Sequence, residues 1–372
     1  MRRILGAILI YTMTSWAAEH DRIEVLERQL SELMAKQAEL ETRTDKLCAH
    51  WTDALELDGY GEMRFSKANT DDVMESIYSF VPSIAYPFGE NIVLNVELEF
   101  AYEGHGSEGN HDVLSYSYID FLFDPAFNLS LGHLLVPVGN ANLGDEPPLF
   151  LGVDLPETET YVIPTTRHHN GLLLSGRLGT QWHYYVGVLD SLNDNDIGVG
   201  IDDGVDENLT HASHAAPVGR LDFLDEARGL DAGVSYLGGS FSYHDEAGNH
   251  GVGEISLVDL HLNYRKNGWD IKLLASTLRI KDGDFTGRMD GAYGTLGYDL
   301  MPLLGGKGEL MPYAGYERLD NLITDEVNWV RNSRIGLRYR PHDDVLIKAD
   351  YRVRSSDEGR EYTAALGVGY LF

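Results

Sequence analysis

Residues 334–372 read RIGLRYRPHDDVLIKADYRVRSSDEGREYTAALGVGYLF. Apolar and polar side chains alternate in three runs within this stretch, at 334–340, 345–354 and 362–372. A period of two predicts β-strands that present one apolar and one polar face. The Pro-His-Asp-Asp segment at 341–344 separates the first two runs and predicts a turn.

The same alternation recurs upstream, for example at 94–103 and 269–276. Turn signals separate the runs, such as Lys266-Asn267-Gly268 and Gly305-Gly306. The runs are roughly ten residues long, the length of a tilted strand that spans a membrane. We count about fifteen to seventeen of them by this period. A closed bacterial barrel needs an even number of strands, so we predict about sixteen.

Alternation alone does not distinguish a secreted β-sandwich from a membrane barrel. Three features favour the all-β transmembrane barrel: the long runs, the abundance of tyrosine (21 residues) often near their ends, and the final Phe372 on an apolar-aromatic face. Downstream of the N-terminus there is no run of 18 apolar residues that would predict a spanning helix. A barrel conceals its lipid face by alternation and has a hydrophilic average, here a mean hydropathy of −0.24.

Composition excludes several classes of protein. The chain has 372 residues, with 29 Lys+Arg against 59 Asp+Glu and a formal charge of −30, so we expect no nucleic-acid partner. Its 43% hydrophobic content argues against disorder. A single cysteine, Cys48, excludes a disulfide framework; a free thiol is the simple interpretation and an intersubunit bridge the alternative.

The N-terminus predicts two separate segments. Residues 1–18 have a basic start, a short apolar stretch and a small-residue cleavage pattern, as in a secretory signal peptide, with a retained anchor as the alternative. Within 19–50, apolar residues from Ile23 to Leu47 follow a heptad with polar Gln37 and Thr44 at a positions. We predict a periplasmic coiled-coil helix that self-associates; packing against the domain at 51–372 is the alternative.

Six basic residues lie on the predicted inner face of the C-terminal runs: Arg334, Arg338, Arg340, Lys348, Arg352 and Arg354. Fixed charges around a narrow aqueous passage select ions by sign. If these side chains line a pore, they attract anions such as phosphate or carboxylates. The alternative is that they pair with inward acids and brace the wall.

The stretch from Leu134 to Gly171 is irregular and rich in proline. Long irregular connections in compact folds usually have a function. We predict that a segment around 137–170 folds inward and narrows the bore, with these residues marking it: Pro137, Gly139, Asp145, Glu146, Pro147 and Arg167.

No residue pattern predicts an enzyme, a cofactor or a metal site. The chain has no Gly-x-Ser-x-Gly, His-Glu-x-x-His or phosphate-loop motif. The pairs His168-His169 and His211/His214 are interpreted as loop histidines. Residues 190–216 carry seven acids and no Lys or Arg, which predicts a solvated external loop, with weak divalent-cation binding as the alternative.

The segment at 134–171, together with the signal peptide, heptads, strand array and terminal Phe372, resembles Gram-negative outer-membrane porins of the phosphate-selective O and P family. The resemblance implies a homotrimer of sixteen-stranded barrels in outer-membrane lipid, passive diffusion of small anionic solutes, and recognition of Phe372 by the barrel-assembly machinery. Two alternatives remain: a TonB-independent importer of siderophores or metal chelates, and a structural outer-membrane tether.

Overall fold

The computed structural model describes residues 55–70, 74–103, 110–144, 146–163, 165, 167–190, 192–193, 215–244, 250–282, 285–321 and 329–372. The predicted signal peptide, the predicted helix at 19–50, Cys48, and His211 and His214 lie outside these residues, as does nearly all of the acidic stretch at 190–216. Those predictions remain untested. Among the described residues, no helix is both long and apolar enough to cross a bilayer.

One sheet contains every strand described. In the first half of the chain they are β1 (Glu56–Ala68), β2 (Glu75–Pro87), β3 (Ile92–Glu103), β4 (Asn110–Asp124), β5 (Phe127–Leu135), β6 (His168–Leu178), β7 (Trp182–Leu189) and β8 (Leu192–Asn193). The second half contributes β9 (Ala216–Asp225), β10 (Leu230–His244), β11 (His250–Lys266), β12 (Trp269–Asp282), β13 (Phe285–Tyr298), β14 (Glu309–Asn321), β15 (Trp329–His342), β16 (Val345–Ser356) and β17 (Gly359–Leu371). A short helix, α3 (Met301–Leu304), connects β13 to β14.

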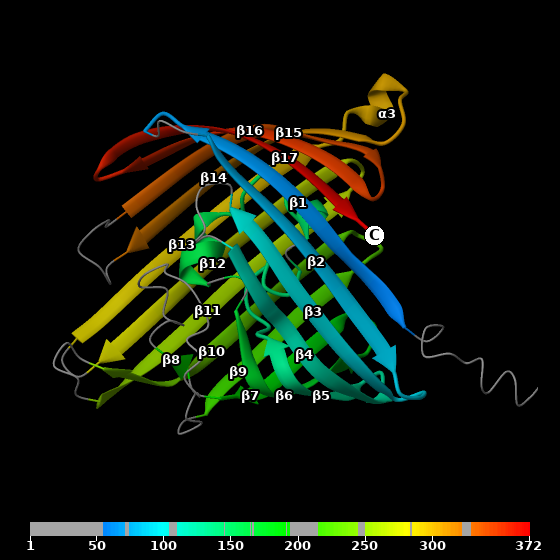
Figure 1. Ribbon diagram of the computed structural model, residues 1–372, viewed down its shortest axis with the longest axis vertical. Coiled ribbons are helices and arrows are strands. Elements are labelled where there is room, and N and C mark those ends of the chain that lie inside the picture. Colours follow the sequence, from blue (N-terminus) through cyan, green and yellow to red (C-terminus); the bar gives the residue numbers. More distant parts are fainter. Residues whose placement is uncertain are drawn as a thin grey trace, which may run out of the picture. The chain divides into compact units, whose positions relative to one another are not determined.

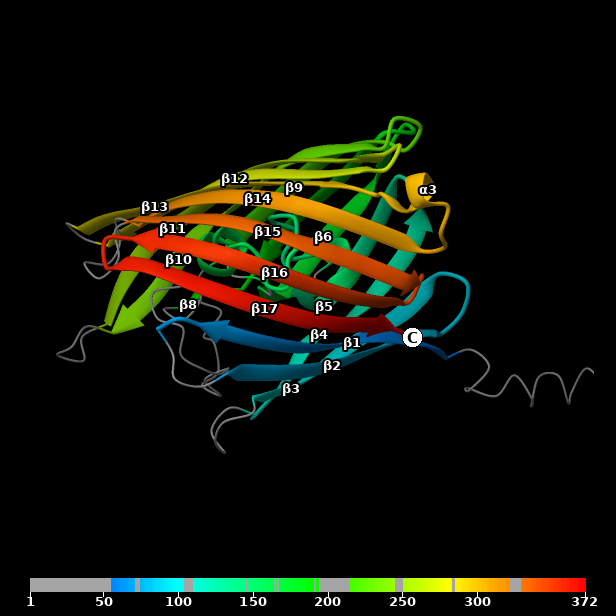
Figure 2. The ribbon, with the colours of Figure 1, turned by 90° about the horizontal axis from the view of Figure 1, so that it is seen from above.

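The sheet closes on itself because β1 pairs with both β2 and β17. The β1–β17 register joins Tyr60 to Leu371 and runs to Ala68 opposite Thr363. Consecutive long strands are antiparallel neighbours, and β7 pairs directly with β9. The two-residue β8 is an addition that runs parallel to β10. The result is a closed barrel of sixteen antiparallel strands, as the alternation predicts (Figures 1 and 2).

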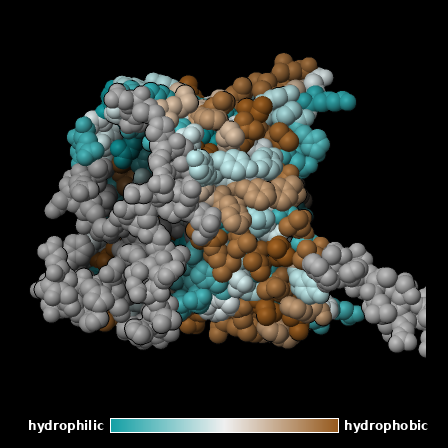
Figure 3. Space-filling model, in the orientation of Figure 1, coloured by the Kyte–Doolittle hydropathy of each residue, from teal (hydrophilic) through white to brown (hydrophobic). Residues whose placement is uncertain are grey.

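The apolar rows face outward. On β12, Leu273 is 46% exposed, whereas the side chains of Leu274 and Ser276 on the inner face are buried. On β15, Ile335 is 64% exposed, and Arg338 on the inner face is wholly buried. Figure 3 shows hydrophobic residues gathered over the outer surface of the strands. An outer surface of this kind is matched to hydrocarbon and not to water.

Aromatic pairs lie at the strand ends next to short turns. The rings of Trp182 and Phe223 are 5.1 Å apart between centroids, and those of Trp269 and Tyr298 are 4.7 Å apart. Such residues form girdles where a barrel meets the lipid headgroups. The turn before Trp269 places Asn267 and Gly268 at φ 53° and 84°, and positive φ at both central residues is what a tight hairpin turn requires.

We expect Leu273→Arg to lower the free energy of unfolding from lipid vesicles by about 2–4 kcal/mol, because a guanidinium would enter hydrocarbon near the middle of β12. The measurement is reversible denaturant unfolding followed by tryptophan fluorescence. Leu304→Arg is the matched control, since Leu304 lies on α3 outside the strands and is 65% exposed. Equal effects of the two variants would contradict an apolar face in lipid.

Candidate functional site

Residues 136–167, here called the inner segment, connect β5 to β6 and fold into the barrel lumen (Figure 1). They contain a 3-10 turn (Pro147–Leu149) and a π-helical turn (Thr158–Val162). The inner segment is shorter than the predicted range of 137–170, because residues 168–170 already belong to β6.

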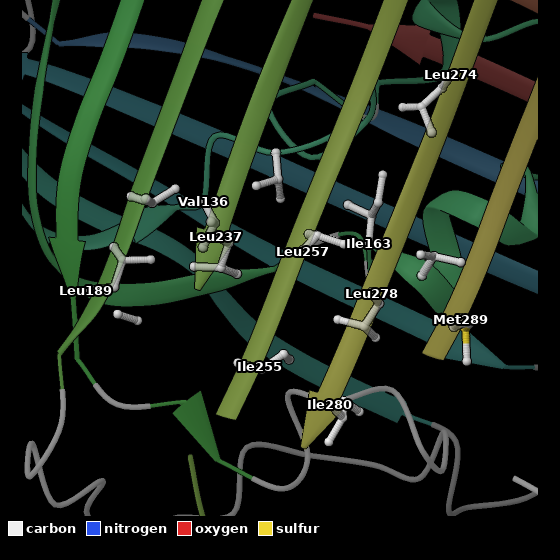
Figure 4. Packing of buried hydrophobic residues seen from close by; sticks show 14 of the residues in the cluster. Val136, Ile163, Leu189, Leu237, Ile255, Leu257, Leu274, Leu278, Ile280 and Met289 are labelled. Carbon is white, nitrogen blue, oxygen red and sulfur yellow. The ribbon is translucent and has the colours of Figure 1, made fainter. Parts of the chain in front are cut away.

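Apolar packing holds the inner segment against one wall. Val136, Val138 and Ile163 are wholly buried and belong to one cluster with inward residues of β10 to β13, among them Leu257 and Leu278 (Figure 4). Each fully buried side chain of this size stabilises the structure by about 1.5–3 kcal/mol. Part of the inner wall that the inner segment covers is therefore apolar.

Carboxylates of the wall accept hydrogen bonds from the backbone of the inner segment. Asp259 accepts from the N–H of Gly139 at 3.0 Å, and Asp350 accepts from that of Val153 at 2.8 Å. Glu317 accepts from the N–H groups of residues 157 and 158, at 3.1 and 2.5 Å. Hydrogen bonds to a charged group contribute about 1.5–3 kcal/mol each. These wall acids fix the position of the inner segment.

The two ends of the inner segment are joined by Asn142. Its side-chain amide donates to the carbonyls of Val136 (2.6 Å) and Arg167 (2.8 Å), and its carbonyl oxygen accepts from the N–H of Arg167 (2.5 Å). Arg167 is buried at the end of the inner segment, directly before β6. At the wall, Pro147 approaches Gly369 so closely that a Cβ on that glycine would lie 2.8 Å from the proline.

Glu159 is a buried carboxyl within the inner segment. The hydroxyl of Tyr293 donates to it at 2.8 Å, and the N–H of Asn140 does so at 3.2 Å. Burial raises the pKa of Glu159 from its usual value of 4.5 to about 7, the hydrogen bonds opposing that shift only in part. Gly139 has φ 69°, and a Cβ on it would lie 2.7 Å from a Glu159 carboxyl oxygen.

Three of the six predicted basic residues are committed to structural contacts. Arg338 is wholly buried, where it pairs with Glu309 at 2.8 Å and Asp270 at 3.3 Å and donates to the Pro148 carbonyl. Lys348 is wholly buried, with its ammonium 3.6 Å from the centre of the Phe150 ring. Arg340 donates to the carbonyl of Asp343 in the following turn. Arg338 and Lys348 thus hold the inner segment and do not reach open space.

The other three basic residues are less buried than Arg338 and Lys348. Arg334 donates to the Asp154 carbonyl at 2.5 Å. Arg352 and Arg354 line a hollow of about 550 Å³ together with Arg64 from β1. Each pairs with an acid: Arg354 with Glu157 at 3.0 Å, Arg352 with Glu361 at 3.5 Å, and Arg64 with Asp154 at 3.3 Å.

Sequence reasoning missed Arg64, because it lies almost 300 residues from Arg352 along the chain. Closure of the barrel brings β1 beside β17 and places Arg64 in the same hollow. The alternation of Glu62, Arg64 and Ser66 in β1 was the available signal. Of the predicted inner-segment residues, Pro137, Gly139, Glu146, Pro147 and Arg167 lie within it, and Asp145 lies outside the described residues.

Within the described part of the chain, one group of side chains converges closely enough for a metal ion. It consists of Asp222, Asp231 and His261. Arg220 already occupies this group, with its Nε 2.8 Å from Asp222 and a terminal nitrogen 3.1 Å from His261. The same guanidinium donates to the carbonyl of Gly139 at 2.6 Å. We interpret the group as an ion network that anchors the inner segment.

The interpretation of His168 and His169 as loop histidines is wrong, because both belong to strand β6 and His169 is buried. His168 faces the ring of His133, with 4.5 Å between centroids, and His169 lies 3.4 Å from Asp190.

Comparisons with known proteins support the fold. The chain is similar in structure to an anion-selective porin from Comamonas acidovorans (TM-score 0.62, 10% identity, 86% of this chain and 99% of that one). It is also similar to OmpF of Salmonella typhi (TM-score 0.61, 13% identity, 87% and 99%) and to OmpT of Vibrio cholerae, an outer-membrane protein in trimer form (TM-score 0.58, 11% identity, 86% and 99%). The structure therefore defines a barrel with the fold of outer-membrane porins.

In sequence, the chain is 27% identical to an uncharacterized protein of Aquifex aeolicus, over 80% of this chain and 75% of that protein. No family model matches the chain.

We expect Gly139→Ala to loosen the inner segment, because its Cβ would push against Glu159. Gly179→Ala is the matched control: φ is 70° there, but a Cβ would meet nothing within 4 Å. Both variants carry the left-handed backbone penalty of about 1–2 kcal/mol, so only the difference between them reports on the contact. The measurement is limited proteolysis of folded protein, and equal cleavage rates would contradict the contact.

The raised pKa of Glu159 predicts that the inner segment is held less firmly as pH rises. Because the pKa of Glu159 is higher in the folded chain than in the unfolded chain, protonation of this carboxyl stabilises the folded state. This stabilisation is complete below pH 4.5, the usual pKa, and is lost as the pH rises through about 7. The full change is about 3 kcal/mol. Proteolysis of the inner segment should accelerate between these values in the wild type, and Glu159→Gln should remove that dependence. An unchanged pH profile in the variant would contradict the assignment.

Proposed function

We propose that the protein is an outer-membrane porin that forms a channel for passive diffusion of small hydrophilic solutes. One observation carries the proposal: a closed barrel with an apolar outer surface surrounds an inner segment that leaves charged hollows open. The similarity to outer-membrane porins supports the same assignment and the outer-membrane location.

We further propose an anion preference centred on Arg64, Arg352 and Arg354. All three line the hollow of about 550 Å³ described above, here called the larger hollow. Their side chains are 29%, 19% and 24% exposed, respectively. Guanidinium groups bind carboxylates and phosphates through paired hydrogen bonds. The acids opposite them, Asp154, Glu157 and Glu361, reduce the net field, so the expected preference is modest.

The proposed organisation of the whole chain follows the sequence analysis. It consists of a signal peptide at 1–18, a periplasmic coiled coil at 19–50 and a barrel at 51–372. The trimer form of the Vibrio cholerae neighbour supports a homotrimer in which the coiled coil would join the subunits.

Purified protein should produce stepwise conductance in planar bilayers. In a potassium chloride gradient, Arg352→Gln with Arg354→Gln should lower the chloride-to-potassium permeability ratio roughly two- to fivefold. A unit charge about 4 Å from an ion is worth about 1 kcal/mol in water, and Glu361 and Glu157, which pair with these two arginines, cancel much of that field. Arg228→Gln, at a turn where the side chain is 77% exposed, is the control. An absence of steps would contradict the channel, and an unchanged ratio would contradict the anion preference.

A further inference from the structure

A second hollow, of about 340 Å³, lies inside the barrel between β3–β7 and the start of the inner segment. Its lining has three acids, three tyrosines, two serines, four leucines and one glycine: Glu97, Asp120, Glu146, Tyr116, Tyr118, Tyr185, Ser130, Ser175, Leu134, Leu135, Leu143, Leu173 and Gly144. No Lys or Arg is among these lining residues. Its charge is therefore opposite in sign to that of the arginines in the larger hollow.

Neutral groups hold the carboxylate of Asp120. Asn95 donates to it at 3.0 Å and Ser130 at 2.5 Å, so its position is fixed without a countercharge. One oxygen of Glu146 is buried and has no hydrogen-bond partner among the described residues. The guanidinium near Tyr185, that of Arg220, is committed to Asp222 and to the Gly139 carbonyl. A cation is the species that this arrangement of charges attracts.

Aromatic faces form part of the same wall. Tyr116 and Tyr118 are inward neighbours on β4 with ring centroids 5.4 Å apart, and Tyr116 lies directly across from Glu97 on β3. Tyr118 and Tyr185 also pack against the apolar cluster beneath the inner segment, which fixes their rings. Aromatic rings beside carboxylates bind ammonium groups attached to an apolar body.

A metal ion fits this hollow less well than an organic cation. Among the described residues, the only group of acids and histidines close enough to share one ion is Asp222, Asp231 and His261, and none of these lines the hollow. Four leucines and three tyrosines would leave a hydrated metal ion against apolar surface. A ligand with an ammonium group and an apolar body satisfies both kinds of lining.

We infer that this hollow, here called the acidic tyrosine hollow, is a binding site for organic monoammonium ions with an apolar or aromatic body. The inference rests on the proposed channel, because the ligand must reach the lumen. It adds a cationic class of solute to a channel whose larger hollow carries the arginines. Solutes with an amine and a separate carboxylate could use both hollows.

The test is block of the potassium current through single channels by phenethylammonium, with uncharged 2-phenylethanol as the probe that lacks the charge. We expect concentration-dependent block by the ammonium compound and none by the alcohol at equal concentration. Glu97→Gln with Asp120→Asn should raise the half-blocking concentration about tenfold or more. Glu358→Gln, which removes a carboxylate from the exposed turn between β16 and β17, should leave it unchanged.

A second pair of variants tests the aromatic wall. Tyr118→Leu should weaken the block, and Tyr118→Phe should retain it. The conductance of each variant without phenethylammonium shows whether that variant is folded. Equal block by the two compounds, or by wild type and the double variant, would overturn the inference. If the full chain conducts no current, the channel proposal fails, and calorimetric titration of detergent-purified protein with phenethylammonium still decides whether the hollow binds it.

Discussion

Hydrocarbon offers no partner to a backbone N–H or C=O group, and this constraint determines the rest of the structure. The sheet satisfies it by closing through β1 and β17, so that each of the sixteen long strands described has a hydrogen-bonded neighbour on both sides. Closure also fixes the two faces. Every second side chain must face lipid, and the others must share the interior with the inner segment.

The interior explains why the net charge of −30 says little about what the barrel admits. Asp259, Glu317 and Asp350 are used to bind backbone N–H groups of the inner segment. Arg338 and Lys348 are used in the same way, against Pro148 and Phe150. Charges of both signs therefore serve first to position the inner segment, and other inward charges line the two hollows.

The strand array, its closure and the inward fold of the proline-rich segment could be predicted from sequence, because a period of two and local turn residues encode them. Whether each inward side chain is exposed in the lumen or buried under the inner segment could not be predicted from sequence. Arg338 on β15 and Arg352 on β16 both point inward from neighbouring strands, yet one is wholly buried and the other lines a hollow. That difference depends on where residues 136–167 dock. Docking is a contact between distant segments, and no local pattern records it.

The central claim is that the apolar rows contact lipid and the polar rows surround an aqueous lumen. Spin labels at Leu260→Cys on β11 and Glu361→Cys on β17, each with Cys48→Ser, test it directly in lipid vesicles. Leu260 faces outward and is 59% exposed, whereas Glu361 lines the larger hollow. The label at 260 should relax faster with oxygen and the label at 361 with a water-soluble nickel chelate. The reverse pattern would contradict the account. A label at 260 that is relaxed by neither reagent would also contradict it, because Leu260 would then lie in a buried core between two sheets.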